Sequence, residues 1–221
     1  MKLPRILCML PVVALLAVSP AQAGKGGRPG FGGPPTPVEI APLSEAEAAT
    51  LTFMREEEKL ARDVYITLHE IWGSGIFSNI SRSEQRHMDT MASQLEKYGL
   101  PDPVTDDTVG VFGNPALAAL YDELVARGEA SLEEALHVGG YIEELDIGDL
   151  EEAIAESTHA DVIRAYENLM RGSRNHLRAF VGQIEAMGVV YEAQVLSQDE
   201  VDAIVNSPME RGGKGGGKGR R

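Results

Sequence analysis

Ser83-Glu84-Gln85-Arg86-His87-Met88 is the stretch around which the rest of this chain is organised. It lies within 76–98, where seven apolar residues recur at helical spacing: Ile76, Phe77, Ile80, Met88, Met91, Leu95 and Tyr98. At about 100° per residue, Glu84 falls in the middle of this apolar stripe and His87 lies about 60° to one side. A carboxylate that points into a protein core is costly unless a partner neutralises it. Because a Glu and a His three positions apart can reach one metal ion, the stretch predicts part of a metal site.

The first 23 residues have the features of a secretory signal peptide. A positively charged start is followed by an apolar run over 6–18 and by the small residues of Ala21-Gln22-Ala23. The run is too short to span a bilayer securely, although an uncleaved anchor is the alternative. We expect cleavage after Ala23, an exported product (periplasmic or extracellular) and no transmembrane anchor after cleavage. Cys8 is removed with the signal, so the mature chain has no thiol for disulfides, catalysis or a cysteine-ligated iron centre.

Two Gly-rich segments flank a long central region. Residues 24–37 predict a disordered Gly/Pro-rich leader and 209–221 a disordered basic tail, which leaves 38–208 as one domain with a sizeable core. The net charge of −14 is concentrated in this domain, because both flanking segments are basic. An acidic surface repels nucleic acid and attracts cations, although solubility alone also accounts for it. We expect metal ions as partners and no nucleic-acid binding by the domain, and a homodimer is compatible with the sequence.

Helix signals dominate the domain. Ser44, Ser131 and Ser197 each precede a Glu by three positions, as in a capping box, and Asn114-Pro115 is typical of a helix start. No segment alternates convincingly enough to predict a strand. We predict four long helices over 44–72, 76–98, 131–156 and 160–187, and short ones over 115–127 and 198–206. With one longer connection in the middle, this pattern predicts an all-α four-helix bundle with short additional helices.

The first and third long helices carry carboxylates on their apolar faces. Glu57 and Glu58 both lie within about 60° of the first stripe, so periodicity does not choose between them. Glu143 falls in the middle of the third stripe, Asp146 about 60° from its centre and Glu144 about 100° from it. The angle predicts that Glu144 lies on an exposed face and that Glu143 points into the core.

The fourth long helix repeats the arrangement of the second with one change. Ser173 lies near the middle of its apolar stripe and His176 to one side, which is the offset of Glu84 and His87 with Ser in place of Glu. The fourth long helix therefore carries an imidazole beside its apolar stripe, without an accompanying carboxylate at the Ser173 position.

These residues resemble a known pattern. Glu58-Lys59-Leu60-Ala61-Arg62-Asp63-Val64-Tyr65 is similar to the first helix of rubrerythrins and ferritins, in which the Glu is an iron ligand. Ser83 to His87 resembles their second-helix E-x-x-H, Glu143 occupies the third-helix glutamate position, and the His176 segment takes the place of the second E-x-x-H. The resemblance covers about 43–190 and is closest to a branch of the ferritin-like superfamily catalogued as a domain of unknown function. It implies a ferritin-like four-helix bundle whose metal ligands are Glu58, Glu84, His87, Glu143 and His176.

Together with the predicted signal peptide, the resemblance leads us to expect an exported protein that holds one or two iron or manganese ions. With two ions, oxidation of ferrous iron or reduction of peroxide is the expected chemistry. Tyr65 then either hydrogen-bonds a ligand, takes part in oxidation or only packs in the core. Ser173 departs from the pattern, because serine is a poor ligand for iron, and either Asp146 or Glu57 would have to compensate. The alternatives are a non-catalytic metal-binding or structural bundle, and a surface-interaction module that uses the Gly-rich arms.

Overall fold

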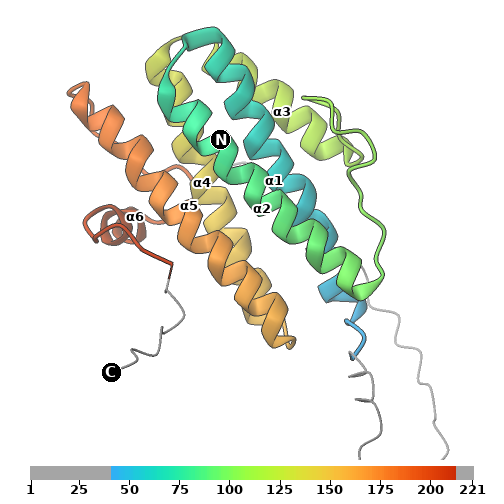
Figure 1. Cartoon of the computed structure of the whole chain (residues 1–221). Helices are drawn as coiled ribbons and strands as arrows, with labels where there is room; N and C mark the ends of the chain where they lie inside the picture. Colours follow the sequence, from blue (N-terminus) through green and yellow to red (C-terminus); the bar gives the residue numbers. More distant parts are fainter. Residues whose placement is uncertain (1–40, 213–221) are drawn as a thin grey trace, which may run out of the picture.

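The computed structural model describes residues 41–212 (Figure 1), and the predicted signal peptide (1–23), the leader (24–37) and the end of the tail (213–221) lie outside them. Within this range the chain is all-helical and has no strand, as predicted. Its six helices are α1 (Glu45–Trp72), α2 (Gly75–Tyr98), α3 (Pro115–Gly128), α4 (Leu132–Glu156), α5 (Ala160–Ala186) and α6 (Gln198–Val205). Among them, none is both long enough and apolar enough to cross a membrane.

The helices begin where the capping signals predict. The Glu47 backbone N–H donates to Ser44 Oγ at 3.1 Å, and the Ser44 N–H donates to the Glu47 carboxylate at 3.0 Å, which completes the box before α1. Asn114 accepts a hydrogen bond from the N–H of Ala116 and starts α3 in the same way. α1 ends at Gly73, whose φ of 64° is the left-handed conformation that glycine adopts without strain.

The four long helices pack in two pairs that face each other (Figure 1). α1 packs against α2 and α4 against α5, and the pairs meet through contacts of α1 with α4 and of α2 with α5. Each pair is joined by a short link, 73–74 or 157–159, so its helices run in opposite directions. The connection from α2 to α4, residues 99–131, is much longer and contains α3. Side chains that point inward from all four long helices can therefore meet.

Two apolar clusters occupy different levels along these helices. The smaller cluster includes Met54, Met91 and Met170, and the larger one includes Tyr65, Phe77 and Phe180. On α1, α2 and α5, the residues of one cluster precede the inward polar residues in the sequence and those of the other cluster follow them. These polar residues lie within 57–58, 84–87 and 173–176. A polar layer between two apolar ones is shielded from bulk water, and charges within it interact strongly.

The outer face of α1 is buried by the connection that follows α2. The Lys59 side chain is fully buried, pairs with Asp63 and donates to the carbonyl of Thr108 at 2.8 Å. Asp63 accepts from the N–H of Gly110 at 3.0 Å. In Figure 1 this connection runs back along α1 before α3 begins. The charged outer face of α1 therefore anchors a long loop.

Glu144 corrects one sequence prediction. Its angle on the helix predicts exposure, but the side chain is completely buried. The segment after α5 folds back over α4: the Glu144 carboxylate accepts hydrogen bonds from Tyr191 Oη at 2.6 Å and from the backbone N–H groups of Gln194, Val195 and Leu196 at 2.9, 2.6 and 2.9 Å. The helix angle correctly directs Glu144 away from the other long helices, but a distant segment covers that face.

Candidate metal centre

Five side chains from four helices meet in the polar layer. Glu58 comes from α1, Glu84 and His87 from α2, Glu143 from α4 and His176 from α5. They form two groups that could each hold a metal ion: Glu58, Glu84 and His87 in one, and Glu84, Glu143 and His176 in the other. Within each group the candidate ligand atoms lie within 4.8 Å of one another. All five predicted residues are therefore together, and Glu84 belongs to both groups.

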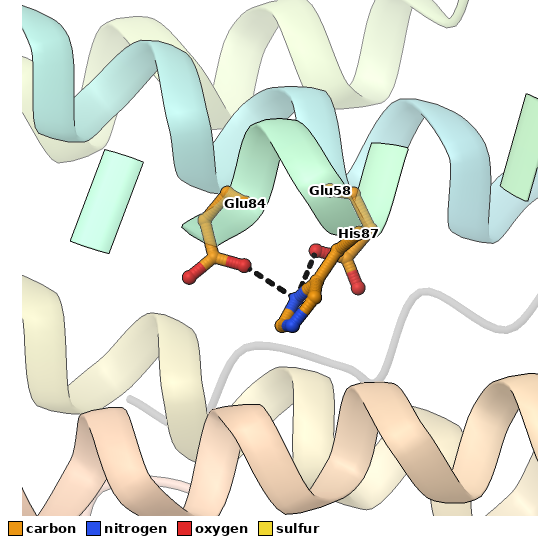
Figure 2. A group of neighbouring side chains, drawn as sticks. All are labelled: Glu58, Glu84 and His87. Atoms are coloured by element: carbon orange, nitrogen blue, oxygen red, sulfur yellow. Dashed lines mark hydrogen bonds and ion pairs between the residues drawn. The ribbon is translucent and has the colours of Figure 1, made fainter. Parts of the chain in front are cut away.

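The first group is held by one turn of α2 against α1 (Figure 2). Nδ1 of His87 lies 2.7 Å from Oε2 of Glu84 and 3.1 Å from Oε2 of Glu58. Glu84 and Glu58 are almost fully buried, and only 9% of the surface of His87 is exposed. Helical periodicity did not distinguish Glu57 from Glu58. In the structure Glu58 is the one of the two that contacts His87.

The second group uses the other oxygen of Glu84. Nδ1 of His176 lies 2.7 Å from Oε1 of Glu84 and 3.4 Å from Oε2 of Glu143. Tyr65 donates a hydrogen bond to Oε1 of Glu143 at 2.6 Å. The two imidazole rings stack with their centroids 5.7 Å apart. Glu84 therefore has one oxygen toward each histidine and links the two groups.

The charges in the layer shift one another's pKa values. Burial raises the pKa of Glu58 to about 7 against the opposing effect of His87. Burial would also raise the pKa of Glu84, but His176 and His87 hold it well below its usual range. Burial lowers the pKa of His176, yet Glu84 and Glu143 outweigh it and raise that pKa to about 10. Burial lowers the pKa of His87 too, but Glu58 and Glu84 outweigh it and raise that pKa, so these shifts favour an ionised Glu84 between two protonated imidazoles.

Three more buried carboxyl groups, Glu57, Asp146 and Asp149, adjoin this set. Burial and neighbouring carboxylates raise the pKa of both Glu57 and Asp146 well above the usual range. Asp149 was not predicted from the sequence. A signal was present, because Glu143, Asp146 and Asp149 follow one another at intervals of three along α4 and so lie on neighbouring turns.

The side chains present fit a bound cation. Six carboxyl groups share the layer with two imidazoles, so even two protonated histidines do not neutralise all of them. Protons or metal ions must supply the remaining positive charge. Oε1 of Glu58 and Oδ1 of Asp146 are buried and have no hydrogen-bond partner. Carboxylate oxygen and imidazole nitrogen are ligands that iron, manganese and zinc accept. The donor set is therefore suitable for one or two such ions.

Residues 47–208 match the family model described as "Uncharacterized protein domain (DUF2202)". Over 171 residues the chain is 52% identical to "Uncharacterized protein MJ0754" of Methanocaldococcus jannaschii, which covers 77% of this chain and 92% of that relative. It is also similar to the crystal structure of hypothetical protein MJ0754 from Methanococcus jannaschii DSM 2661, with a TM-score of 0.76 and 49% identity, over 79% of this chain and all of that one. A family match over most of the chain and a relative this similar lead to one conclusion: the chain belongs to the DUF2202 family.

Proposed function

We propose that this chain is an exported, ferritin-like four-helix protein that binds two iron or manganese ions in its core. With both ions bound it oxidises ferrous iron or reduces peroxide. The observation that carries the proposal is Glu84, a buried carboxylate with one oxygen toward His87 and the other toward His176. If ions bind, Glu84 would be the ligand that the two groups share, one with His87 and the other with His176.

The order of the helices supports the ferritin-like part of the proposal. Two antiparallel pairs joined by one long connection are the connectivity that ferritin-like bundles use. The candidate ligands also come from the helices that the resemblance implies, with one Glu from each of α1 and α4 and the Glu84/His87 pair from α2. The position that departs from the pattern is Ser173 on α5.

Each residue has a distinct part in this centre. Glu58, Glu84 and His87 hold one ion, and Glu84, Glu143 and His176 hold the other. Bound iron or manganese supplies the electron-transfer chemistry. The histidines lose a proton from Nδ1 when a cation takes the place of the present ion pairs. The apolar clusters on either side exclude water from the polar layer.

A second candidate is a non-catalytic bundle whose buried polar residues serve stability alone. The ion pairs of His87 and His176 with Glu84 favour it, because they balance part of the buried charge without a metal. In this case the layer fixes how the four helices align, as buried polar groups do in some helical assemblies.

Metal content separates the two functions. The wild-type protein is purified without chelator, loaded with Mn²⁺ or with Fe²⁺ under anaerobic conditions, and measured by elemental analysis. We expect up to two ions per chain, and a sharp loss in Glu84→Gln, His87→Ala and His176→Ala. Oxygen consumption and peroxide decay then test the activity of the loaded protein.

Glu144→Gln is the matched control, because Glu144 is an equally buried carboxylate on the same helix as Glu143 but bonds to the 194–196 backbone. Its metal content should equal that of the wild type. Equal metal in wild type, Glu84→Gln and His87→Ala would eliminate the metal centre and favour the structural function. Amino-terminal sequencing of the protein from its native host tests export, with Gly24 as the expected first residue.

A further inference from the structure

The α5 helix carries a hydroxyl where the resemblance places a carboxylate. Ser173 is completely buried in the polar layer, one turn before His176. Its Oγ donates a hydrogen bond to Oδ2 of Asp146, and the carbonyl of Leu169 lies 3.2 Å away as a second acceptor. Asp146 comes from α4, which packs directly against α5. A carboxylate from the neighbouring helix therefore lies next to the position where α5 lacks one.

Asp146 also lies beside the two groups of candidate metal ligands. It follows Glu143 by one turn of α4, so both side chains lie on the same face of that helix. Its Oδ1 is buried and has no hydrogen-bond partner, while Oδ2 bonds to Ser173. Besides burial, the neighbours that raise the pKa of Asp146 are Glu58, Glu143 and Glu84, which are the carboxylates of the candidate centre. One oxygen of Asp146 is therefore fixed, and the other remains available beside those groups.

Glu57 is the other residue that could compensate for Ser173, and its surroundings argue against it. Besides burial, the groups that act most on its pKa are Asp149 and Asp146, and Glu58 follows only after them. Glu84 and Glu143, which both act on the pKa of Asp146, are not among these neighbours. Glu57 therefore interacts most strongly with Asp149 and Asp146.

We infer that Asp146 is a further ligand of the centre, which replaces from α4 the carboxylate that α5 lacks, and that Ser173 is the residue that orients it. The inference rests on the proposed function, since it adds a ligand to the same site. Asp146 supplies the negatively charged ligand that the site lacks because α5 has Ser173 in place of a carboxylate. Ser173 then acts as a positioning residue, because its hydroxyl fixes one oxygen of the carboxylate and leaves the other to bind a cation.

The test is metal binding by the full chain, measured with Mn²⁺ by calorimetric titration and by elemental analysis. Asp146→Asn keeps the size of the side chain and removes its charge. We expect it to lower the affinity for at least one ion about tenfold or more, the range seen when groups that support metal ligands are removed. Ser173→Ala should weaken the same ion by a smaller factor. Circular dichroism of each variant establishes that the helices are intact.

The double variant Asp146→Ala/Ser173→Glu returns a carboxylate to α5 while removing the one on α4, and we expect it to recover affinity relative to Asp146→Ala alone. A wild-type chain that binds metal, together with an Asp146→Asn chain of equal stoichiometry and affinity, would overturn the inference and leave the proposed function standing. A wild-type chain without stoichiometric metal would overturn both. Glu84→Gln separates the two outcomes: if this variant loses metal while Asp146→Asn does not, only the inference about Asp146 has failed.

Discussion

The imidazole of His87 lies directly against the backbone of Gly172, across the boundary between α2 and α5. A Cβ atom at position 172 would come within 2.6 Å of both Cε1 and Nε2 of the His87 ring, which is closer than such atoms approach in proteins. Glycine at this point of α5 therefore leaves the space that the ring occupies. The position of His87 relative to Glu58 and Glu84 depends on a residue of another helix.

Gly172→Ala is predicted to displace the His87 ring and lower metal affinity. The added methyl group meets the imidazole, which must rotate or move away from Glu84 and Glu58. Because ligand geometry controls affinity, we expect a loss of about tenfold or more. Titration with Mn²⁺ measures the effect, and unfolding of the metal-free protein shows whether the helix itself is intact.

Gly182→Ala on the same helix is the matched control. A Cβ atom there meets nothing within 4 Å. Alanine in place of glycine within a helix stabilises it by about 0.5–1 kcal/mol, so this variant should be slightly more stable and bind metal like the wild type. Equal metal affinity in both glycine variants would show that the space above Gly172 is not needed by the centre.

Glu144→Gln is predicted to destabilise the protein without changing its metal content. The carboxylate accepts bonds from three successive backbone N–H groups and from Tyr191, and an amide would turn one NH₂ group toward these donors. Hydrogen bonds to a charged group contribute about 1.5–3 kcal/mol, so we expect a loss of about 2 kcal/mol in denaturant-induced unfolding. Backbone amides of 194–196 should also exchange faster with solvent.

Glu143→Gln, at the neighbouring position, is predicted to change the metal content and not the stability of the 194–196 segment. It removes a candidate ligand and should lower metal content, while the 194–196 segment keeps its protection. If the two variants changed metal content equally, Glu143 would have no special role in the centre.

Glu210 is predicted to hold the segment after α6 against α5 in a pH-dependent way. Its carboxylate pairs with Arg174 at 2.6 Å and with Arg178 at 3.0 Å, and these arginines lower its pKa from 4.5 to about 2. A lowered carboxyl pKa means stabilisation that is fully present above pH 4.5 and is lost as the pH falls through 2. An NMR titration of the Glu210 carboxyl should give this pKa, and added salt should raise it.

Glu210→Gln supplies the comparison for that titration. At neutral pH the variant should be less stable than the wild type, and the difference should disappear as the pH approaches 2. A difference that persisted unchanged at low pH would mean that packing, and not the ionised carboxylate, holds this segment.

Local signals predicted the helices and the inward residues well. Ser44 and Asn114 mark helix starts by their own hydrogen bonds to the next turn, and such signals do not depend on the rest of the fold. Glu84 was identifiable because a carboxylate within an apolar stripe needs a partner wherever the stripe is buried. The all-helical fold and the inward placement of Glu84 and His87 therefore followed from periodicity and spacing, whereas the meeting with His176 was expected only from the resemblance.

The residues that were not predicted depend on segments far away in the sequence. Glu144 points away from the other long helices, and only the return of the chain after α5 buries it. Lys59 is likewise buried by Thr108 and its neighbours, in a connection without regular structure. The paths of these segments have no periodic pattern, so helix angles alone could not reveal them. The choice of Glu58 over Glu57 also required the position of His87 on α2.

Tyr65→Phe tests whether the tyrosine hydroxyl supports the centre. The ring packs between Phe77 and Phe180, at centroid distances of 6.3 and 5.3 Å, so phenylalanine fits the same space. The substitution removes the donor to Oε1 of Glu143, and a buried acceptor without its partner costs about 1–3 kcal/mol. We expect lower stability without metal, and weaker metal binding because Glu143 is no longer oriented.

Tyr191→Phe is the control for this last prediction, because Tyr191 donates to the adjacent Glu144 at the same distance of 2.6 Å. It removes an equivalent hydrogen bond outside the candidate centre. We expect a comparable loss of stability with unchanged metal affinity. If both tyrosine variants bound metal like the wild type, Tyr65 would serve packing alone, and the orientation of Glu143 would have to come from His176 and the backbone of α4.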